Sequence, residues 1–315
     1  MAVTLAQAAA TESNDLRRGV IEVFRQESVV FDRIGLEDIV GSSYSYNVDG
    51  ALPGTGFRTV NEAWVESTGV INQRNENLVI LGGDADVDRF IERTKGGTIG
   101  SHRAYQIKQK VKSAQSTYVD ALFNGDVNVN PKGFDGLRKR LIGDQVIDSK
   151  TEATNGDFLS ELDDLFARVD GGMPDVVYAN QKQIAKLKTL GRKSGGAEYI
   201  NSEITGKREF TWNGVPFVDP GAHWQGREIL PIVDGAGDFY AVKFATGEND
   251  PGVLGITNGG VQVYDLGELQ EKPAYRVRIE FYTGLAVQGG KAAARLRGVK
   301  TEAVSYTHLR AHETL

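Results

Sequence analysis

The sequence predicts an α+β protein, and three patterns support that prediction. Between residues 104 and 122, apolar residues recur at steps of three and four, which is the spacing of one helix face. Between residues 275 and 282, apolar and polar residues alternate, as in a half-buried strand. Residues 42–83 contain three tracts rich in β-forming residues, separated by Gly and Pro turns. Together they predict an N-terminal arm, an extended β-hairpin, a body built on a long helix, and a second α/β body.

The composition is that of a folded protein and excludes several kinds of chemistry. The 315 residues are 40% hydrophobic and 25% charged, enough for one large domain or two medium ones. There is no cysteine, which excludes disulfides, thiolate metal sites and cysteine catalysis. The net charge of −6 argues against a dedicated nucleic-acid-binding protein. No apolar run approaches the roughly 20 residues that span a bilayer, so we expect no membrane contact.

The first 83 residues divide into an arm and a polar excursion. Residues 1–41 are interpreted as an arm with helical pieces. Residues 42–83 are interpreted as a long ribbon of paired strands, built from SYSYNV, FRTVNEAWVE and ENLVIL. The ribbon is too polar to form a core, and isolated two-stranded ribbons are marginal in water. We therefore expect it to fold back onto the body or to dock on another subunit.

A short helix and a long helix are predicted next. Residues 84–93 (DADVDRFIER) predict a helix that begins with acidic residues, which suit the positive end of the helix dipole. After a glycine-rich break, the long helix runs for about twenty residues, roughly 30 Å, and Asn124-Gly125 ends it.

Basic residues are concentrated in this part of an acidic chain. Residues 95–140 contain nine Lys or Arg against three Asp, a net charge of +6. The other face of the long helix is predicted to carry Lys108, Lys110 and Lys112, and a second group follows it: Arg138, Lys139 and Arg140. A solvated helix face explains such residues without any function, but their concentration favours contact with something anionic.

From residue 150 a second body is predicted. An amphipathic helix at 158–169 is followed by the strand DVVYA and by a helix that Asn180 caps and Gly191 ends. EFTWNGVPFVDPG predicts a strand–turn–strand, REILPIV and FYAVKF predict further strands, and residues 261–287 predict two long ones. The segment from about Val304 (VSYTHLRAHETL) does not match the rest, and we expect it to be non-native.

No motif for catalysis, cofactor binding or metal binding is complete. The alternating aspartates at 84, 86 and 88 lack the Gly and Glu of a calcium loop, because Arg89 and Lys95 occupy those positions. Two histidines four residues apart in the tail resemble a zinc pair, but Leu309 stands where zinc proteases need Glu. No serine-nucleophile motif of the form Gly-x-Ser-x-Gly occurs in the sequence, so His102 and His223 are not expected to belong to a catalytic triad. We therefore predict no catalytic residue, no cofactor and no metal.

The order of these segments resembles the major capsid protein of tailed bacteriophages, a fold that encapsulin shells also use. FRTVNEAWVESTGVINQRNENLVILGGDADVDRFI is similar to the extended loop of that family and its return into the peripheral domain. PKGFDGLRKRL resembles the segment after the family's spine helix. PDVVYANQKQIAKLKTLGR and WNGVPFVDP resemble the axial-domain helix and the turn after it. The resemblance covers about residues 1–300.

The resemblance implies a tailed-phage capsid fold with a definite division of the chain. The segments are an N-terminal arm (1–41), an extended β-hairpin loop (42–83), a peripheral domain with the spine helix (84–150), an axial α/β domain (151–260), return strands of the peripheral domain (261–300), and a tail (301–315). The arm is short compared with members that carry an N-terminal scaffolding segment. Scaffolding, if used, is then expected from a separate protein.

The resemblance also implies a function and partners. The chain is expected to assemble in the host cytoplasm, as pentamers and hexamers of itself, into the icosahedral virion head that encloses the phage genome. Portal and decoration proteins are further expected partners. The residues expected to contact a neighbouring subunit are in the extended loop: Phe57, Arg58, Glu62, Trp64, Glu66 and Arg74. The six basic residues at 108, 110, 112 and 138–140 are expected to face the lumen and contact packaged DNA without sequence specificity.

Two other functions fit the same sequence. An encapsulin-type nanocompartment has the same fold but encloses enzymes, and genomic neighbours would distinguish it from a phage head. A carboxylate-dependent hydrolase is the alternative from another class. It predicts a stable monomer with a concave acidic pocket.

Overall fold

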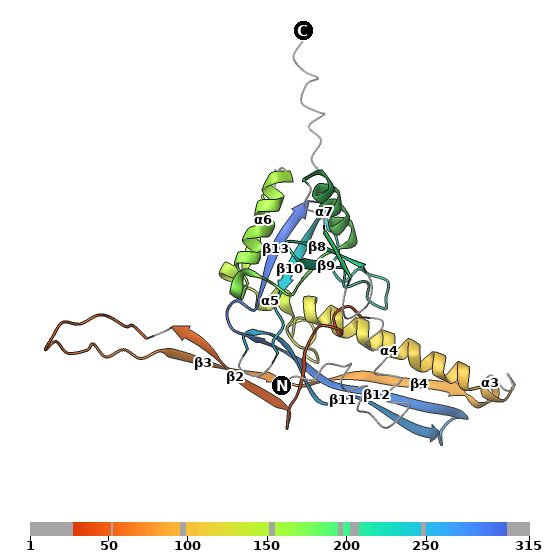
Figure 1. Ribbon diagram of the computed structural model, residues 1–315. Coiled ribbons are helices and arrows are strands. Elements are labelled where there is room, and N and C mark those ends of the chain that lie inside the picture. The colour runs from red at the N-terminus through yellow and green to blue at the C-terminus, as the bar shows by residue number, and fades with distance from the viewer. Residues whose placement is uncertain are drawn as a thin grey trace, which may run out of the picture.

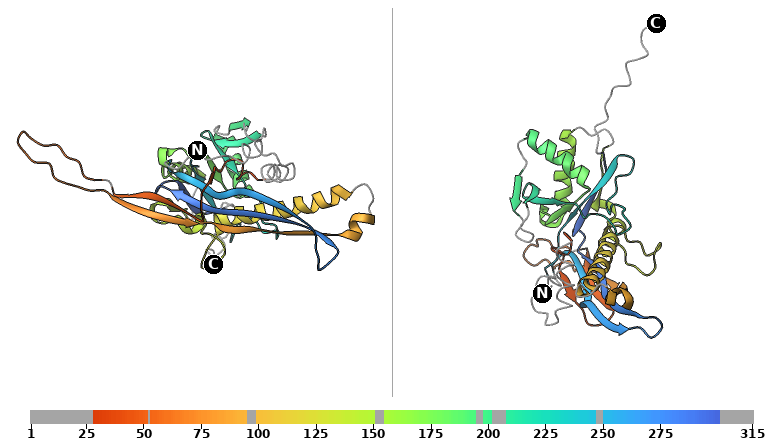
Figure 2. Two further views of the ribbon diagram at one scale, coloured as in Figure 1. Left: turned by 90° about the horizontal axis from the view of Figure 1, so that it is seen from below. Right: turned by 90° about the vertical axis from the view of Figure 1, so that its right-hand side faces the viewer.

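In the computed structural model, two bodies are stacked on one another and a ribbon projects sideways from the lower one (Figure 1). The structure describes residues 28–51, 53–94, 99–150, 155–194, 198–201, 208–246 and 250–300. Seen from below, the ribbon extends the molecule far beyond its body (Figure 2, left). The predicted helical pieces of the arm before residue 28 and the tail from Val304 lie outside the described residues.

The lower body is a four-stranded sheet with one long helix along it. The strand order is β1 (Leu36–Asp38), β11 (Gly252–Glu268), β12 (Ala274–Gln288) and β4 (Val79–Asp88). β1 is parallel to β11, and the other pairs are antiparallel. On β12, Val277, Ile279 and Phe281 are buried and the residues between them are half-buried, which confirms the alternation in the sequence.

The helix α4 (Ile99–Asn124) has 26 residues and is about 39 Å long, which confirms the predicted long helix and its end at Asn124. A short helix, α3 (Arg89–Thr94), precedes it. The chain after α4 returns close to its last turn. A Cβ at Gly136 would lie 2.4 Å from the carbonyl oxygen of Ala121, so only glycine fits there.

The upper body is a seven-stranded sheet covered on one face by two helices. The strand order is β5 (Val146–Asp148), β13 (Ala293–Lys300), β10 (Ala236–Val242), β6 (Val176–Tyr178), β9 (Val215–Val218), β8 (Arg208–Trp212) and β7 (Glu198–Asn201). The helices α6 (Asn155–Ala167) and α7 (Gln181–Ser194) pack their apolar residues on that sheet. Asn180 caps α7, because its Oδ1 accepts a hydrogen bond from the Lys182 amide at 3.0 Å.

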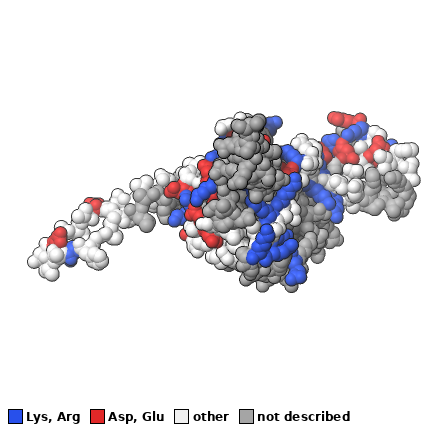
Figure 3. All heavy atoms as spheres, turned by 90° about the horizontal axis from the view of Figure 1, so that it is seen from above, with Lys and Arg blue, Asp and Glu red and all other residues white. Residues whose placement is uncertain are grey.

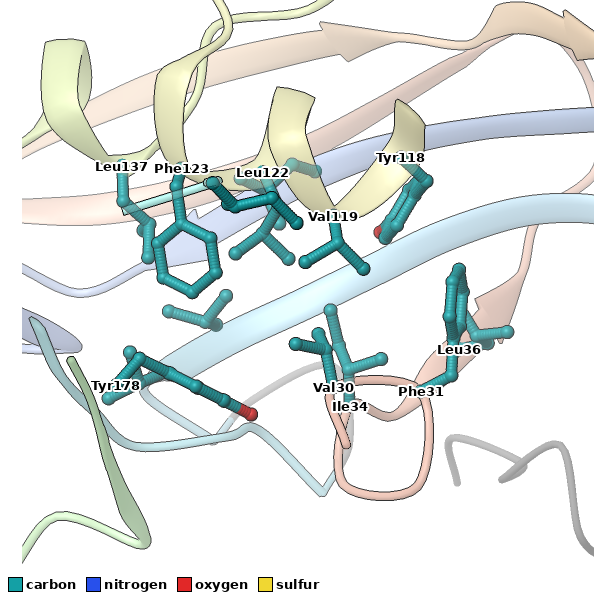
Figure 4. Close-up of a cluster of buried hydrophobic side chains, with 14 of the residues drawn as sticks. Val30, Phe31, Ile34, Leu36, Tyr118, Val119, Leu122, Phe123, Leu137 and Tyr178 are labelled. Carbon is teal, nitrogen blue, oxygen red and sulfur yellow. The ribbon is translucent and has the colours of Figure 1, made fainter. Parts of the chain in front are cut away.

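One hydrophobic core joins the two bodies. The turn at residues 28–34 places Val30, Phe31 and Ile34, all 0% exposed, beneath α4 (Figure 4). The ring of Phe31 lies 4.8 Å from that of Tyr118 on α4, measured between centroids. Tyr178 of the upper sheet belongs to the same cluster. This turn therefore holds α4 of the lower body and β6 of the upper body in a fixed relation.

Several predicted elements differ from the structure. FRTVNEAWVE at 57–66 forms no strand, since no other strand pairs with it at the end of the ribbon. REILPIV contributes only isolated bridges at Glu228 and Val233. Residues 84–88 belong to β4, because they pair with β12, and the helix begins only at Arg89. Asp88 caps that helix by accepting a hydrogen bond from the Phe90 amide at 2.7 Å.

Two further differences concern the C-terminal half. β13 lies within the predicted return strands (261–300) but pairs with β10 and β5 in the upper sheet. The return segment is therefore divided between the two sheets. α7 continues through Gly191 to Ser194 instead of ending at the glycine.

The joining turn provides a test of the shared core. Replacing Phe31 with alanine is expected to lower the free energy of unfolding by about 3–5 kcal/mol, because the vacated volume is enclosed on all sides. Urea unfolding followed by tryptophan fluorescence measures it. Val40→Ala is the control, since Val40 is 102% exposed and its truncation is expected to cost less than about 0.5 kcal/mol. Equal losses of unfolding free energy in the two variants would show that the turn does not contribute to the hydrophobic core.

Candidate assembly interface

The ribbon is a single antiparallel strand pair with only its base buried. β2 (Ser43–Ala51) pairs with β3 (Val70–Asn77) from Ser43 opposite Asn77 to Ala51 opposite Val70. Tyr44 and Tyr46, at alternate positions of β2, are 9% and 6% exposed and pack on β11 and β12. Beyond this base, β3 is exposed along most of its length. The rest of the ribbon thus projects away from the body of its own subunit.

An ion pair and two tyrosines anchor the ribbon to the body. The guanidinium of Arg140, in the short helix α5 (Leu137–Arg140), donates to both carboxylate oxygens of Glu76, with Nη2 2.7 Å from Oε2. The two side chains are only 10% and 17% exposed. Tyr46 also donates to Glu76, at 3.3 Å, and burial raises the pKa of Tyr46. Tyr44 accepts a hydrogen bond from Gln288 at 2.8 Å. These contacts fix the direction in which the ribbon projects.

The tip of the ribbon, residues 53–69, is ordered by its own polar contacts. The Gly54 amide donates to Ser67 Oγ at 2.6 Å across the two arms of the tip. Glu62 Oε2 accepts hydrogen bonds from the backbone amide and the hydroxyl of Thr59, both at 2.9 Å. The hydrogen bond from the backbone amide lowers the pKa of Glu62. The Arg58 guanidinium lies 5.2 Å from the ring centroid of Trp64. The tip therefore has a shape of its own without a hydrophobic core.

Large apolar side chains at this tip are exposed. Phe57 is 109% exposed and Trp64 is 66% exposed, and Val60 and Val65 are exposed at 89% and 90%. Groups of exposed apolar residues rimmed by polar ones mark interaction sites. The structure brings five of the residues predicted for intersubunit contact together here: Phe57, Arg58, Glu62, Trp64 and Glu66. Arg74 lies apart from them, on β3 opposite Tyr46. Their contact with a neighbour stays a prediction.

The three lysines of α4 do not share one face, contrary to the prediction. Lys108 is exposed and Lys112 is half-buried, while the end of the Lys110 side chain lies against Gly83 of β4. The cause is the helical period, because residues two positions apart point in nearly opposite directions and residues four apart point the same way. Lys108 and Lys112 are therefore neighbours, and Lys110 faces the sheet.

Two of the three basic residues after α4 are neutralised by their own chain. Arg140 binds Glu76, as described, and Lys139 Nζ lies 2.6 Å from Asp126 and 2.9 Å from Asp135. Arg138 is exposed, and it forms no ion pair with any residue that the structure describes. Contact of these three residues with DNA stays a prediction, and among them only Arg138 has no ion pair with a residue that the structure describes.

A ladder of carboxylates and guanidiniums crosses β4 and β12. Asp84 binds Arg278 at 2.8 Å, and Asp86 binds Arg276 at 2.7 Å and Lys272 Nζ at 2.5 Å. The hydrogen bonds from Arg276 and Lys272 hold the pKa of Asp86 far below its usual range. The sequence contains a signal for this ladder, since the acids and the arginines alternate at the strand period on two segments that pair.

Three further observations concern metal ligands, His223 and membrane-spanning helices among the residues that the structure describes. His, Asp and Glu side chains form no group of three that could hold a metal ion in that part of the chain. His223 is 8% exposed, its Nδ1 accepts a hydrogen bond from the Gln225 amide, and burial lowers its pKa. Among the described helices, none is both long and apolar enough to cross a membrane.

Comparison with known proteins identifies the fold. No family model matches the chain, and no curated protein matches it by search. The holo-SrpI encapsulin complex from Synechococcus elongatus PCC 7942 is similar with a TM-score of 0.67 and 18% identity over 90% of each chain. The capsid of an empty GTA particle gives a TM-score of 0.62 and 14% identity over 87% of this chain and 91% of that one. The chain from Mycobacterium phage Cain gives a TM-score of 0.57 and 12% identity over 97% of this chain and 100% of that one. The predicted α+β capsid fold is confirmed.

The anchor of the ribbon can be tested by separating the ion pair. Arg140→Met is expected to lower the free energy of unfolding by about 3 kcal/mol, because it leaves the Glu76 carboxylate, only 17% exposed, without its cationic partner. The double variant Arg140→Met with Glu76→Gln is expected to recover part of that loss. Lys139→Met is the control, since its ion pairs are about one-third exposed and should contribute less than about 1 kcal/mol. Denaturant unfolding measures all three. Equal losses for Arg140→Met and Lys139→Met would contradict the anchor.

The carboxylate ladder predicts a dependence on pH. A carboxyl whose folded-state pKa is depressed contributes stability above its unfolded pKa of about 3.9, and that contribution is lost as the pH falls. Asp86→Asn is therefore expected to be less stable than the unaltered chain at pH 7, and the difference should shrink as the pH falls from about 5 to 2. Unfolding free energies measured across this range test it. A difference that does not change with pH would mean that Asp86 stabilises only by its shape.

Proposed function

We propose that this chain is the major capsid protein of a tailed bacteriophage, which assembles from many copies into the icosahedral head. The observation that carries the proposal is the ribbon tip with exposed Phe57 and Trp64, which no described part of the body covers. The fold supports it, since the similar chains include the capsid of a GTA particle. No enzymatic role is part of the proposal.

The tip of the ribbon exposes large apolar side chains to water. Two strands with one mostly exposed face are not stable in water by themselves, so a tip of this length needs a second surface. The anchor at Glu76 and Arg140 aims the tip away from its own subunit, and a neighbour is the surface within its reach. In a closed shell every copy both extends a ribbon and receives one, so each tip is covered.

The remaining partners follow from the proposed shell. Copies would form pentamers and hexamers in the virion, after assembly in the host cytoplasm with a separate scaffolding protein, a portal and decoration proteins. Of the basic residues predicted for the lumen, Lys108, Lys112 and Arg138 remain candidates for non-specific contact with packaged DNA, since their side chains are exposed or half-buried at the surface. Lys110, Lys139 and Arg140 also stay predicted contacts, and a phosphate would compete there with the contacts that they make with Gly83, Asp126 and Glu76.

An encapsulin-type nanocompartment is the second candidate. The specific observation in its favour is the similarity to the holo encapsulin complex, whose TM-score of 0.67 exceeds those of the GTA capsid and the phage chains named above. The two functions differ in what the shell encloses, which is a genome in one case and protein cargo in the other.

Electron microscopy of the purified chain, expressed alone and with its genomic neighbours, tests the proposal. Closed icosahedral particles are expected, and those made in the native setting should contain nuclease-protected DNA. Particles that contain a co-purifying enzyme and no DNA would support the encapsulin alternative. A monomer by light scattering at every protein concentration, in both settings, would contradict a shell function.

Removal of the ribbon tip is expected to abolish assembly and leave the subunit folded. Because Ala51 pairs with Val70, residues 52–69 can be replaced by Asn-Gly, which closes a two-residue hairpin and keeps Glu76 and both anchoring tyrosines. Thermal unfolding should show a folded subunit, and sedimentation should show no particles. The control is the unaltered chain under the same conditions. Normal particles from the shortened chain would contradict the role given to the tip.

A further inference from the structure

The loop that follows β9 lies along the last turns of α4 and is bound to them. Three side chains of α4, spaced four residues apart on one helix face, hold this loop: Ser116, Asp120 and Asn124. Ser116 Oγ accepts a hydrogen bond from the Trp224 amide at 3.1 Å, and Asp120 accepts one from the Arg227 guanidinium. Asn124 Nδ2 donates to the carbonyl oxygen of Ile229 at 2.7 Å. We call residues 219–230 the strap.

The strap is also bound to the start of α7 in the upper body. Asn180, which caps α7, donates from Nδ2 to Glu228 Oε2 and to the carbonyl oxygen of Leu230, both at 2.8 Å. Asp219, the first residue of the strap, accepts a hydrogen bond from the Gly221 amide at 2.9 Å. The strap therefore connects α4 of the lower body with α7 of the upper body.

His223 lies inside the strap as a neutral imidazole. Its side chain is buried, and its Nδ1 accepts a hydrogen bond from the Gln225 amide at 3.3 Å, which requires that this nitrogen carries no proton. The His223 amide donates to the carbonyl oxygen of Arg227 at 2.8 Å, and the Gly226 amide donates to the His223 carbonyl oxygen at 2.8 Å. His223 thus belongs to the turn that places Trp224 and Arg227 against α4.

Two charged groups act directly on the His223 ring, in opposite directions. Asp120 of α4 favours the protonated ring and Arg227 opposes it, while burial is the largest effect and lowers the pKa of His223. The carboxylate of Asp120 is already engaged, because Oδ2 binds Arg227 and Oδ1 accepts a hydrogen bond from Asn124 at 3.0 Å. A proton on His223 therefore has no unused carboxylate on α4 to bind.

The remaining charges near the strap do not favour a proton either. Glu228 is bound by Asn180, and α7, which is attached to the strap through Asn180, contains no acidic residue. Seen from above, Lys and Arg side chains gather on the upper body, to which the strap belongs (Figure 3). Their field opposes an additional positive charge on that body.

We propose that the strap is an acid-sensitive connection between α4 and the upper body, which protonation of His223 opens. A proton on Nδ1 removes the acceptor of the Gln225 amide and places a cation in a buried position beside Arg227. The turn that carries Trp224 and Arg227 then loses its geometry, and their bonds to Ser116 and Asp120 are released. This connection lies within one subunit, so it goes beyond the proposed shell function and does not depend on it.

The direction of the pH dependence identifies His223 as the responsible group. A histidine with a lowered pKa contributes stability above its unfolded pKa of about 6.5, and the contribution is lost as the pH falls. Asp219 acts in the opposite direction, because burial raises its pKa and its protonation favours the folded state. Opening of the strap on acidification therefore cannot come from Asp219.

Amide hydrogen exchange of the full chain between pH 7.5 and 5.5, corrected for the intrinsic effect of pH on exchange, measures the opening. Protection of residues 220–230 is expected to fall on acidification, while that of residues 277–281 in β12 stays constant as the internal control. In His223→Asn, the side-chain Oδ1 can accept the Gln225 amide without titrating. Protection of the strap should then change by less than roughly twofold over the same range.

Titration of the imidazole by nuclear magnetic resonance provides a second, charge-specific test. The pKa of His223 is expected to lie below about 6.5, to rise in Arg227→Met and to fall further in Asp120→Asn. Strap protection that is independent of pH in the unaltered chain would contradict the proposal, as would the same pH dependence in His223→Asn or a His223 pKa of about 6.5 or above. If His223→Asn does not fold, the unaltered chain and the Arg227→Met titration still decide. Failure to form particles alters none of these outcomes, so the two proposals are tested separately.

Discussion

A two-stranded ribbon that cannot bury its own surface is the constraint on which the rest of this structure depends. Its base is stabilised by Tyr44 and Tyr46 against the lower sheet, but the tip presents Phe57 and Trp64 to solvent. Exposed aromatic residues at the tip of a long ribbon are unfavourable in a monomer, since they promote non-specific association. They are tolerated where the fold directs them to one surface. The ion pair between Arg140 and Glu76 supplies that direction.

A projecting ribbon of this kind keeps its direction only if the body that holds it is rigid. The turn at 28–34 fills the space between α4 and the upper sheet, and Arg33 of that turn binds Glu209 of β8 at 2.6 Å. The same cluster includes Leu137, the first residue of α5, and the last residue of that helix, Arg140, holds the ribbon. The anchor, the long helix and the upper body thus share one core. A shift of the upper body is expected to reach the ribbon through this shared packing rather than through a flexible linker.

The sequence predicted the elements with strong periodicity and not those that depend on a partner. The apolar spacing of α4 and the alternation of β12 arise from the residues of each element, so both were predicted correctly. FRTVNEAWVE has the composition of a strand but no strand to pair with, and it forms a loop. Lys110 lies on a different face of α4 from Lys108, because two positions along a helix turn the side chain by about 200°. The bond between Arg140 and Glu76 joins residues 64 positions apart, and no local pattern indicates it.

The tip of the ribbon is the place where the central claim is most directly measurable. Amide hydrogen exchange can compare residues 53–69 in assembled particles with the same residues in dissociated subunits. If a neighbouring copy covers the tip, its amides exchange much more slowly in the particle, while those of the base around Tyr44 and Tyr46 change little. Equally fast exchange at the tip in both states would show that no neighbour covers it, and would contradict the account.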